Sequence, residues 1–433
     1  MKIVLHFFQR FCIPLMLLVC VWVSSNLKWG DDDRKNVVIS DGKGYYAYLP
    51  AALIYQDLNL CFFDSIENKY FDENTRYEYR TGAYGKTIDK YFAGVAVMQL
   101  PFFLAGHGLT LMSNETPDGY SKWYIICICL GAIFWLGVGL YYLRKLLRLH
   151  GASDGLSAFV LYLIFFGTNL YHYSVIEPCM SHLYSFSLVS MFLYFGKTWI
   201  DGGQKKQGLI TALLFGVIFL VRPVNVLAAL WLIYEAGGMK VLVQRKLEFI
   251  SRPWLTLLAL LLMILPFTLQ LGIWKIQTGH WFVNSYGDEA FHFLQPHVFD
   301  FLLSYKKGLF VYLPLTLIAL LGIIPLWKKD RNRAVIALLF FSLIIYILSS
   351  WWQWYYGGSF GTRVIIEFLP MLATLLFVLL RSLHSTRSKI AVYTCVITLT
   401  LLCQFQTIQY RYMLIHWSEM TSEKYWDVFG KVP

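Results

Sequence analysis

The sequence predicts an all-α fold, a polytopic bundle of about eleven transmembrane helices. Hydrophobic residues make up 57% of the 433 residues and charged residues only 15%, whereas a soluble chain carries roughly 25% charge. The apolar residues fall in runs of about 15–22 residues, the length that crosses a hydrocarbon core as a helix. Lys and Arg gather in short clusters between these runs, as they do in cytoplasmic loops. The net charge of +11 therefore reflects membrane topology, and we expect no nucleic-acid partner.

Each predicted helix corresponds to one apolar run. In chain order the runs span 11–27, 91–113, 123–143, 155–175, 178–196, 208–221, 223–236, 254–274, 309–327, 334–351, 363–382 and 389–408. Basic clusters lie between several of them, at 144–148, 197–206, 240–246, 328–333 and 381–389. If every run crossed the membrane, these clusters and the N-terminus would lie on opposite sides. Since positive charge favours the cytoplasmic side for both, one run must fail to cross.

The run 91–113 is the best candidate for the segment that does not cross. It carries Gln99, Pro101 and His107 and follows a long polar stretch, as expected of a helix that re-enters or lies at the interface. Without it, the N-terminus and every basic cluster face the cytoplasm, and the C-terminal tail faces outward. The sequence then predicts one multi-pass domain in the cell (inner) membrane, spanning 1–433, with outer loops at 28–122, 275–308 and 352–362.

Two features of the chain leave alternatives open. Lys2 and Arg10, ahead of the apolar stretch 11–25, also fit a cleaved signal peptide, although an uncleaved first span agrees better with the parity of the spans. Most cysteines lie inside apolar runs, where we expect them to pack against neighbours. Cys61 and Cys179 alone fall on the predicted outer side, which leaves room for one disulfide.

The first outer loop, 28–122, is long for a structureless connection, which indicates a function. Within it, residues 45–55 predict an amphipathic interfacial helix and 64–90 a polar loop. Asp41 lies just ahead of that helix, between glycines that free the backbone to turn. A carboxylate at the membrane surface is partly desolvated, so we expect its pKa to rise toward the range of a general base. The alternative is that Asp41 caps the helix that follows.

A glycine-rich turn joins two late spans on the outer side. The stretch 351–363 reads Trp-Trp-Gln-Trp-Tyr-Tyr-Gly-Gly-Ser-Phe-Gly-Thr-Arg, and part of it is an ordinary aromatic belt of a membrane interface. Backbone N–H groups, a helix N-terminus and a guanidinium together make a phosphate site. Since positive charge is otherwise sparse on this side, we predict that Arg363 binds a phosphate.

Three further polar residues lie at the edges of apolar runs, and each has a structural alternative. Arg222 lies between two short runs, and an arginine at that depth usually faces a cavity or a partner. Lys90 lies at headgroup level, where it either contributes to a site or simply snorkels to the interface. His182 stands about one turn inside the next span, either in a site or as a satisfied packing residue.

The outer loop 275–308 holds further polar groups. Asp288 and Glu289 are candidates for contacts with an acceptor, and Lys307 for a contact with a phosphate, although a solvated loop is the default interpretation. The histidines of this loop lack the spacing of a metal site, so we predict no metal. The sequence also lacks a P-loop and a glycine-rich dinucleotide motif, so we expect no nucleotide-driven chemistry on the cytoplasmic side.

This arrangement resembles the GT-C superfamily of polytopic glycosyltransferases, which includes the bacterial aminoarabinose transferase for lipid A and the protein O-mannosyltransferases. A first span runs directly into a long outer loop with an acidic residue, Asp41, next to interfacial helices. Lys90-Tyr91-Phe92 precedes an amphipathic run, and the following span ends in basic residues at 141–148. The stretch 351–363 looks like one found in uncharacterised bacterial members. The resemblance covers the whole chain as architecture but only short stretches as motif.

The resemblance implies a membrane glycosyltransferase. Members of the superfamily transfer a sugar from a polyprenyl-phosphate donor on the outer face of the membrane, usually with inversion. Their acidic residue in the first outer loop is the catalytic base, which carries over to Asp41 and an acceptor hydroxyl. Their basic residues hold the lipid phosphate, which carries over to Arg363, Lys90 and Arg222. The acceptor stays open between a glycan, a lipid and a protein.

The same resemblance bears on the sugar and on cofactors. Tyr45, Tyr46, Trp354 and Tyr355 are the aromatic residues expected to stack on sugar faces or to wall the lipid groove. The lipid-linked sugar is itself the donor substrate, so no separate cofactor is expected. Many members carry a second acidic residue beside the first, whereas Gly42 follows Asp41 here. A requirement for a divalent metal therefore stays open.

Other functions predict other patterns. A flippase or another transporter of lipid-linked sugars places polar residues near the bilayer midplane, often in symmetric halves, whereas here they gather on one side. A polysaccharide polymerase or ligase that uses a lipid diphosphate would hold several arginines in one large late outer loop. A non-enzymatic membrane scaffold is the remaining alternative.

Overall fold

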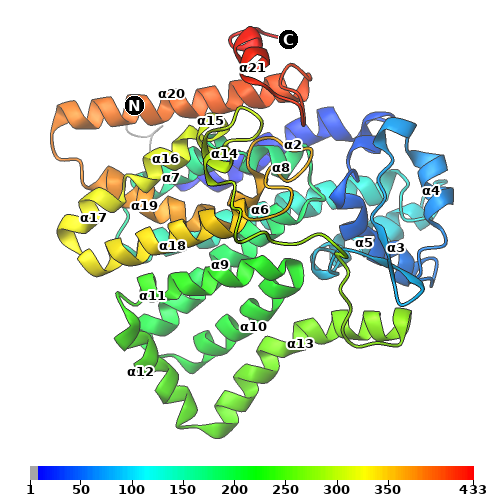
Figure 1. Cartoon of the computed structure of the whole chain (residues 1–433), viewed down its shortest axis with the longest axis horizontal. Coiled ribbons are helices and arrows are strands. Elements are labelled where there is room, and N and C mark those ends of the chain that lie inside the picture. The colour runs from blue at the N-terminus through cyan, green and yellow to red at the C-terminus, as the bar shows by residue number, and fades with distance from the viewer. Residues whose placement is uncertain (1–7) are drawn as a thin grey trace.

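The computed structural model describes residues 8–433 and is mostly helical. Lys2, on which the signal-peptide alternative partly rests, lies outside the described residues. In the view of Figure 1, α20 and α13 lie at opposite edges of the molecule, and most of the other long helices run between them in roughly the same direction.

Within residues 8–433, six helices are long and apolar enough to cross a membrane. They are α5 (Gly94–Leu111), α6 (Lys122–Leu149), α13 (Pro253–Thr278), α18 (Arg331–Ser349), η4 with α19 (Arg363–Phe368 and Leu369–Arg381) and α20 (Thr386–Arg411). A pair bent by 106°, made of η3 with α11 (Pro223–Leu230 and Trp231–Glu235) and α12 (Met239–Ile250), raises the number to seven if it forms one span. The predicted count of about eleven is not confirmed.

Every apolar run of the sequence nevertheless contains a helix. Among the remaining runs, one forms α9 (Ser181–Gly202), an unbroken helix of 22 residues. The others form shorter or broken helices, α2 (Cys12–Lys28), α7 (Asp154–Phe166), α8 (Leu170–Val175), α10 (Lys205–Val221), α15 (Leu309–Tyr312), α16 (Pro314–Leu320) and α17 (Ile323–Lys329). The run 309–327 is divided because Pro314 has no N–H group to continue the first of its helices. Because of breaks of this kind, the number of apolar runs in the sequence does not give the number of helices that cross the membrane.

The centre of the bundle is α9, which packs between α6 and α10 and against η4. Its residues from Ser181 to Ser190 are buried on every side. By contrast, α13 packs on α10 but exposes most of its apolar side chains. An apolar helix with this exposure is expected to face lipid.

The first outer region, 28–122, is folded rather than extended. It contains η1 (Asp33–Asn36), α3 (Asp41–Leu53), α4 (Phe63–Tyr70), η2 (Glu73–Thr75), and the strands β1 (Arg80–Ala83) and β2 (Lys86–Asp89). The predicted interfacial helix is present as α3, but it is not amphipathic, because residues 42–51 are all buried. Lys43 in α3 donates to both carboxylate oxygens of Glu67 in α4, at 2.7 and 2.8 Å, with both side chains almost fully buried.

The prediction that 64–90 is a loop is wrong at both ends, because its beginning lies in α4 and its end forms two strands. The strands β1 and β2 pair in an antiparallel hairpin with Ala83 opposite Lys86. Tyr84 and Gly85 form its turn with φ values of 51° and 71°. A two-residue turn with both φ values positive matches the twist of a hairpin, and this carries the chain from α4 back toward Lys90.

The run 91–113, expected not to cross, forms α5, whose length and composition fit a span. Gln99 and His107 each find a hydrogen-bonding partner inside the protein, although Gln99 Oε1 is buried without one among the described residues. Gln99 Nε2 donates to the hydroxyl of Tyr184 at 2.9 Å, and the His107 ring lies 2.5 Å from the hydroxyl of Tyr124. The polarity that argued against a span is thus neutralised by neighbours that the sequence does not place beside it.

The disulfide left open by the sequence is not formed. Cys61 is exposed, Cys179 is buried, and both are free thiols. The chain ends in α21 (Ser422–Val428), beyond α20, and α14 (Val298–Leu303) lies in the loop that precedes α15.

Candidate functional site

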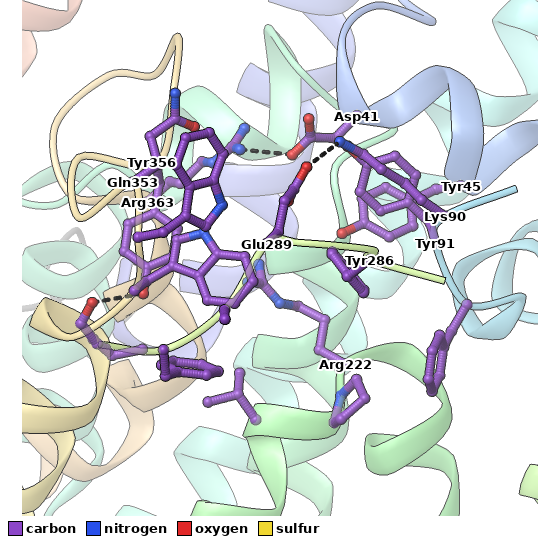
Figure 2. Close-up of a pocket in the computed structure, with 18 of the residues that line it drawn as sticks. Asp41, Tyr45, Lys90, Tyr91, Arg222, Tyr286, Glu289, Gln353, Tyr356 and Arg363 are labelled. Carbon is purple, nitrogen blue, oxygen red and sulfur yellow. Dashed lines mark hydrogen bonds and ion pairs between the residues drawn. The ribbon is translucent and has the colours of Figure 1, made fainter. Parts of the chain in front are cut away.

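A cavity of about 720 Å³ lies where the first outer region meets the late turn 351–363 (Figure 2). Its lining comes from five stretches of chain that are far apart in the sequence. The residues that line it are Asp41, Tyr45, Tyr77, Lys90, Tyr91, Phe92, Val221, Arg222, Pro223, Val224, Tyr286, Glu289, Ala290, Phe291, Phe293, Leu348, Trp351, Trp352, Gln353, Tyr356 and Arg363. Six of the residues singled out by the sequence are among them.

Asp41 reaches the cavity from the first turn of α3 and pairs with Arg363. Its Oδ2 accepts a hydrogen bond from Arg363 Nη2 at 2.6 Å, and its Oδ1 accepts one from the Tyr77 hydroxyl at 2.9 Å. The two charged side chains are only 17% and 10% exposed. Ser40 is the N-cap residue of α3, so the alternative that Asp41 caps this helix is wrong.

Close packing fixes the start of α3. A Cβ atom at Gly42 would lie 2.8 Å from the Cβ of Cys179, and one at Gly44 would collide with the ring of Tyr91. These glycines therefore permit close approach, whereas the sequence pointed to freedom to turn. Ser40 has a φ of 48°, a sparsely populated backbone conformation of the kind found beside functional sites. The backbone that carries Asp41 is held in one place.

The surroundings of Asp41 set its charge. Burial alone would raise its pKa, as the sequence predicted. The guanidinium of Arg363, the hydroxyls of Tyr91 and Tyr77, and the ammonium of Lys90 act in the opposite direction and hold the pKa below its ordinary value. The prediction of a raised pKa is wrong, because it omitted the cations that the fold brings to the carboxylate. Asp41 is therefore ionised at neutral pH.

Lys90 enters the same cavity from the residue after β2. Its Nζ lies 3.2 Å from Glu289 Oε1, with the two side chains 17% and 30% exposed. The loop that carries Glu289 is tied to this point, because the hydroxyl of Ser285 donates to the carbonyl of Lys90 at 2.8 Å. Lys90 is thus an ion-paired residue of the cavity, and the alternative that it merely snorkels is wrong.

Arg222 enters the cavity where α10 ends, opposite Asp41 in Figure 2. Its Nη1 lies 3.2 Å from Oε1 of Glu367, a residue of η4. The same oxygen lies 2.9 Å from Nδ1 of His182. His182 and Glu367 do not line the cavity, and both are buried behind Arg222. Their contacts hold one edge of the guanidinium on the side away from the cavity.

One wall of the cavity is apolar. It is formed by Val221, Pro223 and Val224 around Arg222, and by Leu348 near the end of α18. Phe291 of the outer loop and Trp351 also line the cavity, with ring centroids 4.8 Å apart. The cavity therefore presents carboxylates and cations at one end and an arginine set in hydrocarbon at the other.

Six predicted site residues lie outside the cavity, three of them inside the protein. His182 has been described. Tyr46 is fully buried, and its hydroxyl donates to the carbonyl of Gly119. Lys307 is buried, and its ammonium donates to the carbonyl of Ser359, which ties the glycine-rich turn to the preceding loop. Burial lowers the pKa of Lys307 to about 7.

The other three lie in loops beside the cavity. Asp288 is exposed, one residue from Glu289. The ring of Trp354 stacks on His297 with centroids 6.0 Å apart, and Lys306 lies 3.6 Å above the ring of Tyr355. In the stretch 351–363 the first three residues and Tyr356 line the cavity instead.

The sequence reasoning missed several residues of the site. Tyr77 and Tyr286 come from regions interpreted as solvated loop, and Glu367 lies inside an apolar run where no role was assigned. Tyr91 follows Lys90 in the sequence, but the sequence analysis assigns it no role, although its hydroxyl lies 2.6 Å from that of Tyr77. The tyrosine-rich composition near Asp41 was the only available signal. In the described residues, no group of three or more His, Cys, Asp or Glu is placed to hold a metal ion.

No protein-family model matches the sequence, and no curated protein does either. Among solved structures, three chains match. One is the archaeal oligosaccharyltransferase AglB from Archaeoglobus fulgidus, in complex with an inhibitory peptide and a dolichol-phosphate. The similarity has a TM-score of 0.47 and 10% sequence identity, and it covers 98% of this chain and 58% of AglB. This chain thus spans little more than half the length of that protein.

The charge state of Asp41 gives a first prediction. In Arg363→Gln, fewer groups counteract the effect of burial on the pKa of Asp41. This pKa therefore rises relative to that in the unaltered protein. Infrared difference spectra recorded against pH follow the carboxyl band that is missing in Asp41→Asn. Arg34→Gln, which removes the half-buried partner of the exposed Asp31, serves as the matched control and leaves the band unmoved. An Asp41 band that titrates at the same pH with and without Arg363 contradicts this account.

Proposed function

We propose that this protein is a membrane glycosyltransferase that moves a sugar from a polyprenyl-phosphate donor to an acceptor hydroxyl. The composition of the cavity carries the proposal. An ionised carboxylate, Asp41, lies at one end, and a guanidinium, that of Arg222, lies in an apolar wall at the other (Figure 2). A lipid-linked sugar presents a matching order of groups, with a polyhydroxyl ring, a phosphate and a hydrocarbon chain.

Arg222 is the first anchor for the donor phosphate. Its Nη1 faces Glu367, His182 and Ser181, which leaves the N–H groups of Nη2 and Nε for a ligand. Guanidinium groups bind phosphate through paired, charge-assisted hydrogen bonds. Val221, Pro223 and Val224 border it, so the first isoprene units lie on an apolar surface when the phosphate is bound. The hydrocarbon chain then leaves the cavity toward lipid.

Arg363 and Lys90 complete the positive field around the phosphate. Each already has a carboxylate partner, Asp41 at 2.6 Å and Glu289 at 3.2 Å. In the proposal, Arg363 orients Asp41 and adds charge at the reacting centre, while Lys90 turns from Glu289 toward the developing phosphate anion. Glu289 is then free to accept hydrogen bonds from sugar or acceptor hydroxyls.

The transfer step follows from these positions. The acceptor oxygen forms a bond to the anomeric carbon on the face opposite the phosphate, and its proton passes to Asp41. The bond between the anomeric carbon and the phosphate oxygen breaks, and its electron pair leaves with the polyprenyl phosphate. Because the pKa of Asp41 is low, the proton moves as the carbon–oxygen bond forms and the hydroxyl becomes acidic. Cations aimed at the leaving phosphate lower the barrier, and no nucleotide is needed.

The ends of α18 support an outer location for the chemistry. Leu348 near its C-terminal end lines the cavity, whereas its N-terminal end follows Lys328 and Lys329. Since basic clusters favour the cytoplasm, the opposite end of the helix is proposed to face the outer side of the inner membrane. This orientation of α18 places the C-terminus outside, and we propose that the N-terminus lies in the cytoplasm. Tyr45, Tyr91 and Tyr286 offer rings to the sugar.

Replacing the proposed base tests the reaction. Asp41→Asn removes the proton acceptor and lowers the rate of transfer by about 100-fold or more. The assay uses the protein in proteoliposomes with radiolabelled polyprenyl-phosphate hexoses and a cell-envelope extract as acceptor. Asp33→Asn, an exposed carboxylate of the same outer region, is the control and retains full activity. Full activity in Asp41→Asn removes the mechanism, and donor movement across the bilayer without a new glycosidic bond indicates a transporter.

Replacing the proposed phosphate anchor tests donor binding. Arg222→Gln loses charged hydrogen bonds to the phosphate and weakens binding of polyprenyl phosphate by about 10- to 100-fold. Quenching of tryptophan fluorescence reports binding, because Trp351 and Trp352 line the cavity. Arg76→Gln changes an exposed arginine of the outer region and leaves the affinity unchanged. Equal affinities for the Arg222 variant and the unaltered protein place the phosphate elsewhere.

A further inference from the structure

A second cavity, of about 980 Å³, lies at the other end of the bundle. It is formed where α6, α17 and α19 end and where α18 begins, and it includes Lys197 of α9. Figure 1 shows α17 and the adjoining end of α18 at the left of the molecule, away from α3 and α4 at the right. Arg333 of α18 lines this cavity and Leu348 of the same helix lines the first. The two residues are about 22 Å apart along the helix axis.

The basic residues of this cavity fall into two groups. Arg333 is fully engaged, because it donates to Asp330 at 2.7 Å and to the carbonyls of Tyr234 and Glu235. Lys197 pairs with Asp201 at 2.6 Å. These two cations are part of the fold and are not free for a ligand.

The second group lacks carboxylate partners among the described residues. Lys328 and Lys329 end α17 and are exposed at the rim, with no ion pair in the part of the chain that the structure describes. Arg381 ends α19, and one of its nitrogens donates to the carbonyl of His150 at 3.0 Å. Its other N–H groups remain available. Three uncompensated cations therefore surround one opening.

The inner wall beside these cations is apolar. Leu321 contributes from the turn between α16 and α17, Ile324 and Pro325 from α17, and Phe377, Val378 and Leu379 from α19. The opening thus combines a hydrocarbon surface with a rim of positive charge. A free anion uses only the rim, whereas an amphipathic anion uses both.

We propose that this cavity binds an anionic phospholipid, with the headgroup phosphate held by Lys328, Lys329 and Arg381 and an acyl chain laid along the apolar wall. The position along α18, most of a hydrocarbon thickness from the first cavity, places the cations at the level of lipid headgroups. Basic pockets between helix ends on the cytoplasmic side are a recognised form of lipid site. The proposal does not depend on the glycosyltransferase function.

Positive charge at this end also follows from topology alone. The two explanations differ in what they predict for basic residues outside the cavity. Lys240 and Lys246 of α12 are exposed and do not line it. They lie on the same end, because Arg245 of α12 donates to the carbonyl of Ile200 near the end of α9 at 2.9 Å. They provide a control of equal charge.

The test titrates phosphatidylglycerol into the full-length protein in a neutral maltoside detergent and follows bound lipid by native mass spectrometry. Lys328→Gln/Lys329→Gln weakens binding by about tenfold or more, whereas Lys240→Gln/Lys246→Gln leaves it unchanged. Phosphatidylcholine binds more weakly than phosphatidylglycerol to the unaltered protein. Inorganic phosphate at millimolar concentration does not displace the lipid.

Three results overturn the proposal. If the two double variants lose lipid binding equally, the loss reflects surface charge and not this cavity. Equal binding of phosphatidylcholine and phosphatidylglycerol removes the role of the anionic headgroup. Displacement of the lipid by inorganic phosphate makes the rim a site for a free anion, without a contribution from the apolar wall.

Discussion

The ion pair between Asp41 and Arg363 is the contact on which the site depends. It joins residues that are 322 positions apart and connects the first outer region to the turn between α18 and α19. Removing one partner of a buried pair leaves an uncompensated charge and is costly, so the two segments are held together. The close packing of Gly42 and the unusual backbone of Ser40 serve the same placement. The cavity exists because these segments meet.

Each charge in the cavity is balanced before a ligand arrives. Asp41 faces Arg363, Glu289 faces Lys90, and Glu367 with His182 supports Arg222. Such pairing lowers the penalty of holding charges in a partly buried space. It also leaves Arg222 as the cation whose partner lies outside the cavity. An anionic ligand therefore meets Arg222 without first displacing a carboxylate from the lining.

The amino-acid sequence predicts a mostly helical fold and singles out Asp41, Lys90, Arg222 and Arg363, which the structure brings to one cavity. Lys90, Arg222 and Arg363 stand at the ends of apolar runs, and helix length brings one set of ends together. The acidic partners of these cations are not predicted from the sequence, because Glu289 and Glu367 meet Lys90 and Arg222 only through long-range contacts. The predicted direction of the Asp41 pKa was wrong because Arg363, which lowers it, also reaches the carboxylate only through a long-range contact. The count of spans is not confirmed, because breaks such as that before Pro314 do not alter hydropathy.

The central claim is that Asp41 and Arg222 flank one bound lipid-linked sugar. The most direct measurement is a cryo-electron microscopy structure of the protein with a non-transferable polyprenyl-phosphate sugar analogue. The account predicts the phosphate within hydrogen-bonding distance of Arg222, the chain against Val221 and Val224, and the sugar ring beside Asp41. Phosphate density remote from Arg222 contradicts the account. A sugar ring too far from Asp41 for an acceptor hydroxyl to lie between them also contradicts it.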